Sequence, residues 1–183
     1  MRPQLPELIS QALLAVDCSH RRRMEIEHQQ RHRHRENAIA QHRQTFDIPP
    51  GDAEEFIFGY TCVNDVTAAE VLNENPDFAQ WCRSKGYDTF GCLGPVIATD
   101  LDWAQARVVT TLDGVERQNY PLSDMIMPPA ELVSRVSHDM TLLPGDVIAC
   151  GTSVGVGSIK DGATVVITIE GIGSLTNRLA PPA

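Results

Sequence analysis

Asp65 is the residue in the central part of the chain whose type and surroundings best suit chemistry. It lies in GYTCVNDVTAAE, residues 59–70, directly after an apolar run that predicts a buried strand. Thr67 followed by Glu70 has the spacing of a capping box, so we expect a helix that begins at Thr67 and a tight loop before it. In that loop the Asp65 carboxylate either accepts hydrogen bonds from the loop's own amides or binds a metal ion from a rigid strand end.

Lys85 and a glycine-rich stretch are two further candidates. Lys85 precedes a glycine and has Tyr87, Phe90 and Leu93 close by in the sequence. A single lysine is ordinarily a solvated surface charge, whereas these neighbours are also compatible with a place along the wall of a cleft. In GTSVGVG, residues 151–157, no Gly-Lys-Ser/Thr follows, which argues against a phosphate-binding loop. We expect instead a strand that leads into a loop whose backbone can approach a ligand.

The elements that must position these residues are mostly strands. Asp113-Gly114, between two of them, is a strong signal for a hairpin turn. The helices are expected to be short and peripheral, which predicts an α+β, β-rich domain built on a β-sandwich or roll. Strands are expected at 56–63, 94–98, 106–112, 115–120, 147–152 and 164–173. Helices are expected at 5–16, 67–74, 77–84 and 128–140, and a turn with a short helix within 49–55.

The charge is distributed unevenly along the chain. The net charge of −9 argues against a general affinity for nucleic acid or anionic membranes. Residues 21–43 hold seven Arg against three Glu, a net of +4, so the remainder sums to −13. The window 24–46 also contains four of the six histidines, so it is a metal site, an arm for nucleic acid, or a segment foreign to the fold. The acidic remainder disfavours the nucleic-acid arm, and His32 and His34 alternate without an ordered scaffold for a transition metal.

The cysteines and the apolar runs indicate the cellular compartment of the protein. Five cysteines without a C-x-x-C spacing indicate reduced thiols in a cytoplasmic protein. The apolar run near the start, ISQALLAVDC, is short and fits an amphipathic helix better than a targeting segment. No stretch approaches the ~20 apolar residues of a membrane span, so we expect no membrane partner.

Several stretches, in this order, resemble the fumarylacetoacetate hydrolase family. GYTCVNDVTAAE is similar to its strand–loop–helix metal motif, KGYDTFGCLGP to its central lysine loop, and DGVERQNYPLSDMI to its substrate-side hairpin. MTLLPGDVIACGTSVGVG and IEGIGSLTNRL are similar to its C-terminal signature. The resemblance covers about residues 48–179. It implies a mixed β-sandwich roll that usually forms homodimers, with residues 48–180 as the family-like domain and 1–47 as an atypical N-terminal segment.

The resemblance also implies an activity and site residues. Members of the family are metal-dependent enzymes that act on 2-oxo acids, including acylpyruvate C–C hydrolases, decarboxylases, isomerases and hydratases of aromatic catabolism. Asp65 matches the family's third metal carboxylate, and Lys85 matches the active-site lysine near the developing negative charge. Gln118 and Thr152 match positions that line the substrate pocket.

The remaining metal ligands of the family come from a Glu-x-Glu pair on an upstream strand. Alternation on a strand places residues i and i+2 on one face, so both carboxylates reach one ion. Glu25-Ile26-Glu27 has this spacing, and the resemblance therefore implies a metal site of Glu25, Glu27 and Asp65. Hard oxygen ligands of this kind suit Mg²⁺, Mn²⁺ or Ca²⁺.

The sequence departs from the family pattern in three places. Ala69 stands where the family commonly has arginine, and the family's N-terminal His–Glu acid–base pair has no match. After Glu27, HQQRHRHRENAIAQHRQTF replaces an apolar strand, and a reading-frame slip is one explanation for this interruption. The alternative function is therefore a truncated, catalytically impaired homologue that lacks the His–Glu pair.

Overall fold

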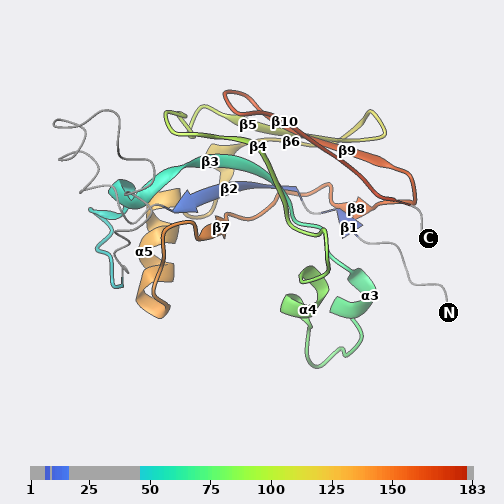
Figure 1. Ribbon diagram of the computed structural model, residues 1–183, viewed down its shortest axis with the longest axis horizontal. Helices are drawn as coiled ribbons and strands as arrows, with labels where there is room; N and C mark the ends of the chain where they lie inside the picture. The colour runs from blue at the N-terminus through green and yellow to red at the C-terminus, as the bar shows by residue number, and fades with distance from the viewer. Residues whose placement is uncertain (1–6, 9, 17–45, 181–183) are drawn as a thin grey trace, which may run out of the picture. The chain divides into compact units, whose positions relative to one another are not determined.

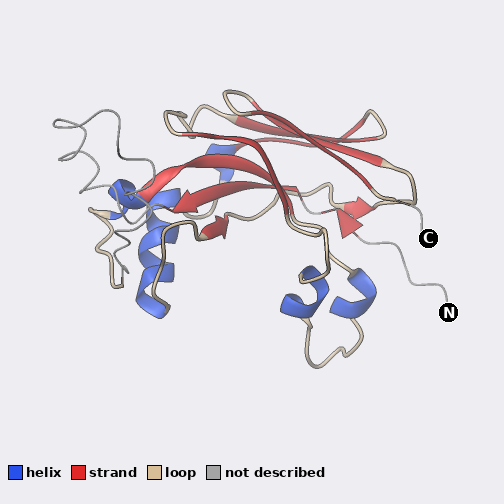
Figure 2. Ribbon diagram, in the orientation of Figure 1, coloured by secondary structure: helices blue, strands red, loops and turns tan. Residues whose placement is uncertain are grey.

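The computed structural model of the protein describes residues 7–8, 10–16 and 46–180. Strands dominate these residues and the helices are short (Figure 1, Figure 2), which confirms the expected α+β, β-rich fold. The strands are β1 (Glu7–Leu8), β2 (Ser10–Val16), β3 (Ile57–Asn64), β4 (Cys92–Ala98), β5 (Arg107–Leu112), β6 (Val115–Pro121), β7 (Val147–Ala149), β8 (Gly157–Ser158), β9 (Thr164–Ile169) and β10 (Gly173–Arg178). The helices are η1 (Ala53–Phe56), α3 (Ala69–Leu72), α4 (Trp81–Lys85), η2 (Leu122–Asp124) and α5 (Pro129–Asp139).

Within the described residues, the strands form three sheets. β1 pairs with β8, and the two four-stranded sheets have the orders β10-β9-β5-β6 and β4-β3-β2-β7. The chain divides into two compact units. Among the described residues, the first unit contains 7–8, 10–12, 61–124 and 151–180, and the second contains 13–16, 46–60 and 125–150. None of the helices that the structure describes has the length and apolar character needed to cross a membrane.

The core of the first unit is built on β9 and β5. Every second residue of β9 is buried, namely Val165, Ile167 and Ile169. Antiparallel pairing places the buried Val108 of β5 opposite Ile169, and the buried Thr110 opposite Ile167. This period of two puts one apolar face of the strands in the core, and a slip of one residue would expose it.

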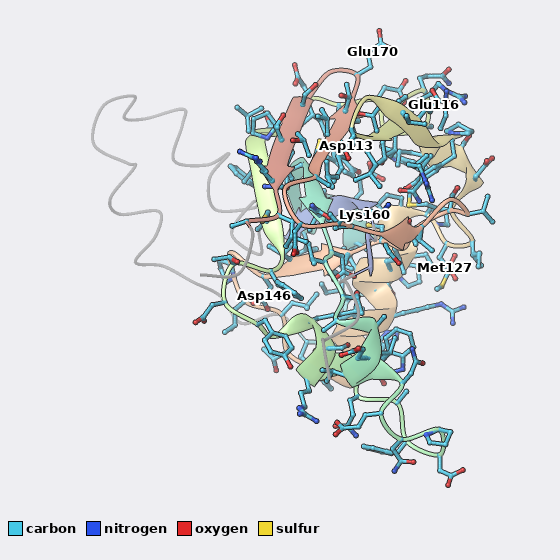
Figure 3. All side chains as sticks on the ribbon, turned by 90° about the vertical axis from the view of Figure 1, so that its right-hand side faces the viewer. Asp113, Glu116, Met127, Asp146, Lys160 and Glu170 are labelled. Atoms are coloured by element: carbon cyan, nitrogen blue, oxygen red, sulfur yellow. The ribbon has the colours of Figure 1, made fainter. Side chains whose placement is uncertain are left out.

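Two hairpins complete the same sheet. β5 and β6 are joined by Asp113 and Gly114, which have φ values of 49° and 79°. Positive φ at both positions is what a type I′ hairpin turn requires, so the predicted hairpin is confirmed. The Asp113 carboxylate also accepts a hydrogen bond from the Thr164 N–H at 2.8 Å, which ties the turn to β9. β9 and β10 turn at the exposed Glu170, whose side chain points away from the sheet (Figure 3).

The second unit is organised around α5, which packs against η1. Proline at the start of α5 suits the first turn of a helix, where no backbone donor is needed. The buried face of the helix carries Val133, Ser134 and Ser137. The Ile48 N–H donates to Ser137 Oγ at 2.9 Å, and Ser134 Oγ donates to the Ile48 carbonyl oxygen at 2.8 Å. Two helix hydroxyls thus satisfy the backbone of a buried residue that belongs to no helix or strand.

The helix predicted at 5–16 is wrong. The structure has strands β1 and β2 there, and β2 pairs antiparallel with β7, with Leu13 opposite Ala149. The pairing partner lies more than a hundred residues away, and tertiary context of this kind overrides local helical periodicity. The helices predicted at 67–74 and 77–84 are present but shorter, as α3 and α4, which pack against each other.

Candidate functional site

Asp65 lies where β3 ends in the first unit. The preceding residues, Thr61 to Asn64, are buried. The Val66 N–H donates to the Asn64 carbonyl oxygen at 3.0 Å, which turns the chain directly after the strand. The Asp65 side chain is 14% exposed. The fold therefore holds this carboxylate in a tight turn at the end of a buried strand.

Lys85, the last residue of α4, reaches back to this carboxylate. Its Nζ donates to Asp65 Oδ2, and it also donates to Thr67 Oγ1 at 3.1 Å. The backbone of α4 is tied to the same loop because the Ala68 N–H donates to the Ser84 carbonyl oxygen at 2.8 Å. The Lys85 side chain is 30% exposed. Lys85 is therefore a paired and partly enclosed charge, and the reading of it as a freely solvated surface lysine is wrong.

Thr67 is a member of this cluster that the sequence did not single out for chemistry. The expected capping role is wrong, because α3 begins at Ala69, after Ala68, without a side-chain cap. The fully buried Thr67 hydroxyl instead donates to the Asp65 carbonyl oxygen at 3.3 Å and accepts from Lys85. A threonine two residues after an aspartate in a tight loop is the one local signal that could have indicated this role.

Gln118 and Thr152, both predicted to line a substrate pocket, are brought together. Gln118 on β6 is buried, and its Nε2 donates to Thr152 Oγ1 at 2.9 Å and to the Ser153 carbonyl oxygen at 3.0 Å. Both amide hydrogens are therefore used to hold the loop. Gln118 Oε1 is buried with no hydrogen-bond partner among the described residues, so any ligand of this side chain must offer a donor.

The glycines of the 151–157 loop have a reason in the fold itself. Gly155 has a φ of +104°, and a Cβ placed on it would lie 2.0 Å from the Arg117 carbonyl oxygen. A Cβ on Gly157 would lie 2.5 Å from the Arg117 guanidinium. β6 is an edge strand of its sheet, and the loop runs closely against it. The sequence predicted that these glycines let the loop backbone approach a ligand. In the structure they let the loop approach β6.

The predicted metal ligands are only partly described. Glu25, Glu27 and the histidine-rich window up to residue 45 lie outside the described residues. In the part of the chain that the structure describes, no group of three or more His, Cys, Asp or Glu side chains is placed to hold a metal ion. Asp65 provides one hard oxygen donor, which suits a divalent cation. The metal site of Glu25, Glu27 and Asp65 therefore stays a prediction, of which the described residues contain Asp65 alone.

Two buried groups on β3 have shifted pKa values. Burial raises the pKa of Cys62, on β3, to about 11, so this thiol stays protonated near neutral pH and is a poor nucleophile or metal ligand. In the second unit, burial and the nearby Glu54 carboxylate raise the pKa of Tyr60 well above its usual range. The described cysteines, which also include Cys82, Cys92 and Cys150, are free thiols.

The family model described as "Fumarylacetoacetate (FAA) hydrolase C-terminal" matches residues 36–180. The chain belongs to the fumarylacetoacetate hydrolase family. A protein of Mycobacterium tuberculosis is 46% identical to this fumarylacetoacetate hydrolase homologue over 145 residues, which cover 78% of this chain and 54% of the relative. The chain spans about half the length of the curated relatives it matches.

Solved structures of the fumarylacetoacetate hydrolase family have the same fold. The crystal structure of 5-carboxymethyl-2-hydroxymuconate delta-isomerase from Mycobacterium smegmatis matches with a TM-score of 0.80 at 36% identity, over 100% of this chain and 61% of that one. Fumarylpyruvate hydrolase from Pseudomonas aeruginosa, solved with Mn²⁺ and pyruvate, matches with a TM-score of 0.79 at 23% identity, over 99% of this chain and 68% of that one. The second likeness concerns the fold alone.

Proposed function

We propose that the chain is a divalent-metal-dependent enzyme that acts on 2-oxo acids through a stabilised enolate, as an acylpyruvate C–C hydrolase, decarboxylase, isomerase or hydratase. The observation that carries the proposal is the Asp65–Lys85 pair at the end of β3, within the family's own motif. The family model and the isomerase among the solved relatives support this range of reactions. The proposal includes a homodimer in the cytoplasm and a small-molecule substrate, with no nucleic-acid or membrane partner.

Lys85 supplies the electrostatic part of this chemistry. A 2-oxo acid that loses a bond alpha to its ketone develops an enolate, and a fixed positive charge beside the enolate oxygen lowers the barrier. The Asp65–Lys85 pair is partly enclosed, and partial enclosure strengthens the effect of the lysine charge relative to bulk water. Gln118 holds Thr152 at the start of the glycine loop, where the Thr152 side chain would contact substrate.

Glu25, Glu27 and Asp65 would hold the divalent ion. When bound, such an ion supplies Lewis-acid stabilisation of the enolate. Mg²⁺ and Mn²⁺ both suit carboxylate ligands. Mn²⁺ is a sensible first probe because the Pseudomonas aeruginosa hydrolase was solved with it.

Calorimetry and turnover test the proposal together. We expect the full chain to bind Mn²⁺ or Mg²⁺ and to turn over oxaloacetate or an acylpyruvate. Asp65→Ala should weaken Mn²⁺ binding by roughly 100-fold and abolish turnover, because a direct ligand matters at least as much as an outer-shell partner. Asp100→Ala, at an exposed bend, is the control and should bind as the wild type does. An absence of both binding and turnover in the wild type would refute the proposed function.

The second candidate, a catalytically impaired homologue, is favoured by one observation. Ala69 stands where the family commonly has arginine, so one contact near the site is missing or replaced. The same experiment separates the two candidates. Mn²⁺ binding without turnover of either substrate supports the impaired homologue.

A further inference from the structure

We propose that Thr67 is a positioning residue, whose buried hydroxyl orients the Lys85 ammonium so that its third N–H is directed toward the ligand. The inference rests on the proposed function in one respect only, namely that Lys85 faces a substrate. The orientation of Lys85 by Thr67 is a separate claim about the protein, and it can be tested separately.

The burial of Thr67 is the first observation. Its side chain is fully buried between β3 and α3, yet neither element uses its hydroxyl. The hydroxyl makes two hydrogen bonds: it donates to the Asp65 carbonyl oxygen at 3.3 Å and accepts from Lys85 Nζ at 3.1 Å. A hydroxyl has one hydrogen to donate, and Thr67 uses it on the Asp65 carbonyl. Its oxygen is therefore directed to Lys85 as an acceptor.

The geometry of an ammonium group is the second step. Lys85 has three N–H donors at tetrahedral angles. The described residues accept two of them, at Asp65 Oδ2 and at Thr67 Oγ1. Once two directions of a tetrahedral group are fixed, the third is fixed as well. With Asp65 as its only acceptor, the lysine side chain could turn about the Nζ–Asp65 direction by rotation of its own C–C bonds, and the third N–H would have no defined target.

Threonine suits this position better than the similar residues. Its branched Cβ restricts χ1, so the hydroxyl keeps one direction at little entropic cost. Valine has nearly the same shape without the hydroxyl, and would leave the Asp65 carbonyl without its donor and Lys85 without one acceptor. Serine keeps the hydroxyl and loses the methyl group.

The backbone of α4 is held by a contact that does not involve the Thr67 side chain. The Ala68 N–H donates to the Ser84 carbonyl oxygen at 2.8 Å, and Ser84 is fully buried. Removal of the Thr67 hydroxyl should therefore leave α4 in place and change the direction and mobility of Lys85 alone. This separates a positioning role from a merely structural one.

The two lysines of the chain allow a direct measurement. Lys85 and Lys160 are the only lysines in the sequence, and Lys160 is exposed, so it serves as the internal reference amine (Figure 3). The full chain is briefly acylated with acetic anhydride, and mass spectrometry gives the ratio of modification at Lys85 to that at Lys160. We expect a low ratio in the wild type and in Thr67→Ser. We expect the ratio to rise roughly tenfold in Thr67→Val, which is the effect of one lost hydrogen bond to a charged group.

Two matched pairs keep this measurement decisive. The wild type and Thr67→Val have side chains of nearly the same shape and differ in the hydroxyl. Thr67→Ser and Thr67→Ala both lack the methyl group and also differ in the hydroxyl. The second pair answers the question if Thr67→Val does not fold. An unchanged ratio in the folded variants without a hydroxyl overturns the proposal. An equal rise in Thr67→Ser does so too, because the methyl group would then be responsible.

Turnover forms the second arm of the experiment. With Mn²⁺ and whichever of oxaloacetate and the acylpyruvate the wild type consumes, the variants without a hydroxyl should lose roughly tenfold in kcat. KM and Mn²⁺ affinity should stay within about twofold, and Thr67→Ser should recover kcat. A wild type that neither binds Mn²⁺ nor turns over either substrate refutes the proposed function, whereas the acylation ratio still decides the role of Thr67.

Discussion

Gln118 and Lys85 are polar side chains whose hydrogens are directed by the fold before any ligand arrives. Both amide hydrogens of Gln118 hold the loop after β7, and two of the three ammonium hydrogens of Lys85 hold the loop after β3. Donors that are already oriented need little reorganisation when negative charge develops nearby. They therefore stabilise that charge more strongly than freely rotating donors would. The substrate-binding roles of Gln118 and Thr152 stay predictions that this geometry makes specific.

Cys62 gives a prediction of pH dependence at the same scale. Burial raises the pKa of its thiol in the folded protein from 9.0 to about 11. Between these values the unfolded chain loses its proton while the folded chain keeps it, so the free energy of unfolding should fall as the pH rises. The slope should be at most about 1.4 kcal/mol per pH unit. Urea denaturation at pH 8, 9 and 10 measures it.

The control for Cys62 is the variant Cys62→Ala. This variant should be less stable at every pH because a buried side chain is shortened. It has no thiol to titrate, so the fall of the free energy of unfolding between pH 9 and 10 should be smaller than in the wild type. If Cys62→Ala and the wild type lose stability in parallel as the pH rises from 9 to 10, the buried thiol is not the group responsible.

Among the elements, the contact of the 151–157 loop with β6 has the sharpest steric requirement. The loop covers an edge strand, whose backbone groups would otherwise be open to another chain. The Arg117 carbonyl oxygen lies where a side chain on Gly155 would begin. Loop and strand together place Thr152 beside Gln118.

Gly155→Ala should therefore be strongly destabilising. Its Cβ would lie 2.0 Å from the Arg117 carbonyl oxygen, which forces the loop away from β6. We expect a loss of about 3 kcal/mol or more in the free energy of unfolding, measured by urea denaturation. Hydrogen exchange should also become faster in residues 151–157.

Gly151 provides the matched control for this substitution. It has the same φ of +104°, but a Cβ on it would meet nothing within 4 Å. Gly151→Ala should thus show the cost of the backbone conformation alone, about 1 kcal/mol. Equal losses for the two variants would show that the contact with Arg117 has no energetic consequence.

At the scale of the whole molecule, the chain divides into two compact units. The first contains Asp65, Thr67 and Lys85, and also the hydrogen-bonded pair of Gln118 and Thr152. In the second, Ile48 is hydrogen-bonded to the Ser134 and Ser137 hydroxyls of α5. The Asp47 N–H also donates to the Ser137 carbonyl oxygen at 2.9 Å. Asp65 and Lys85, the pair on which the proposed function rests, therefore lie in the first unit, while the second is stabilised by its own buried hydrogen bonds.

Ser137→Ala tests the hydrogen bond between α5 and Ile48 in the second unit. The substitution leaves the buried Ile48 N–H without its acceptor, which should cost about 1–3 kcal/mol. Thermal unfolding and hydrogen exchange at Ile48 are the measurements, and the Ile48 amide should exchange faster. Ser123→Ala, at an exposed position in η2, should leave both unchanged. An Ile48 amide as protected as in the wild type would contradict this account.

The sequence by itself determined the features that depend on neighbouring residues. The apolar run at 56–63 predicted β3, and Asp113-Gly114 predicted the hairpin of β5 and β6, because strand-forming composition and turn geometry are local properties. The motif around Asp65 indicated the family for the same reason. Asp65 and Lys85 were recognisable as candidates because each lies within a short and characteristic stretch.

Only the tertiary structure decided the features that depend on a distant partner. β2 is a strand because β7 pairs with it, the Thr67 hydroxyl serves Lys85 because α4 returns to the end of β3, and Gly155 is required because the loop lies on Arg117. Such contacts join residues that are from 18 to more than 100 positions apart. Local propensity carries no information about them, and their combined energy exceeds the preferences that a short segment has alone.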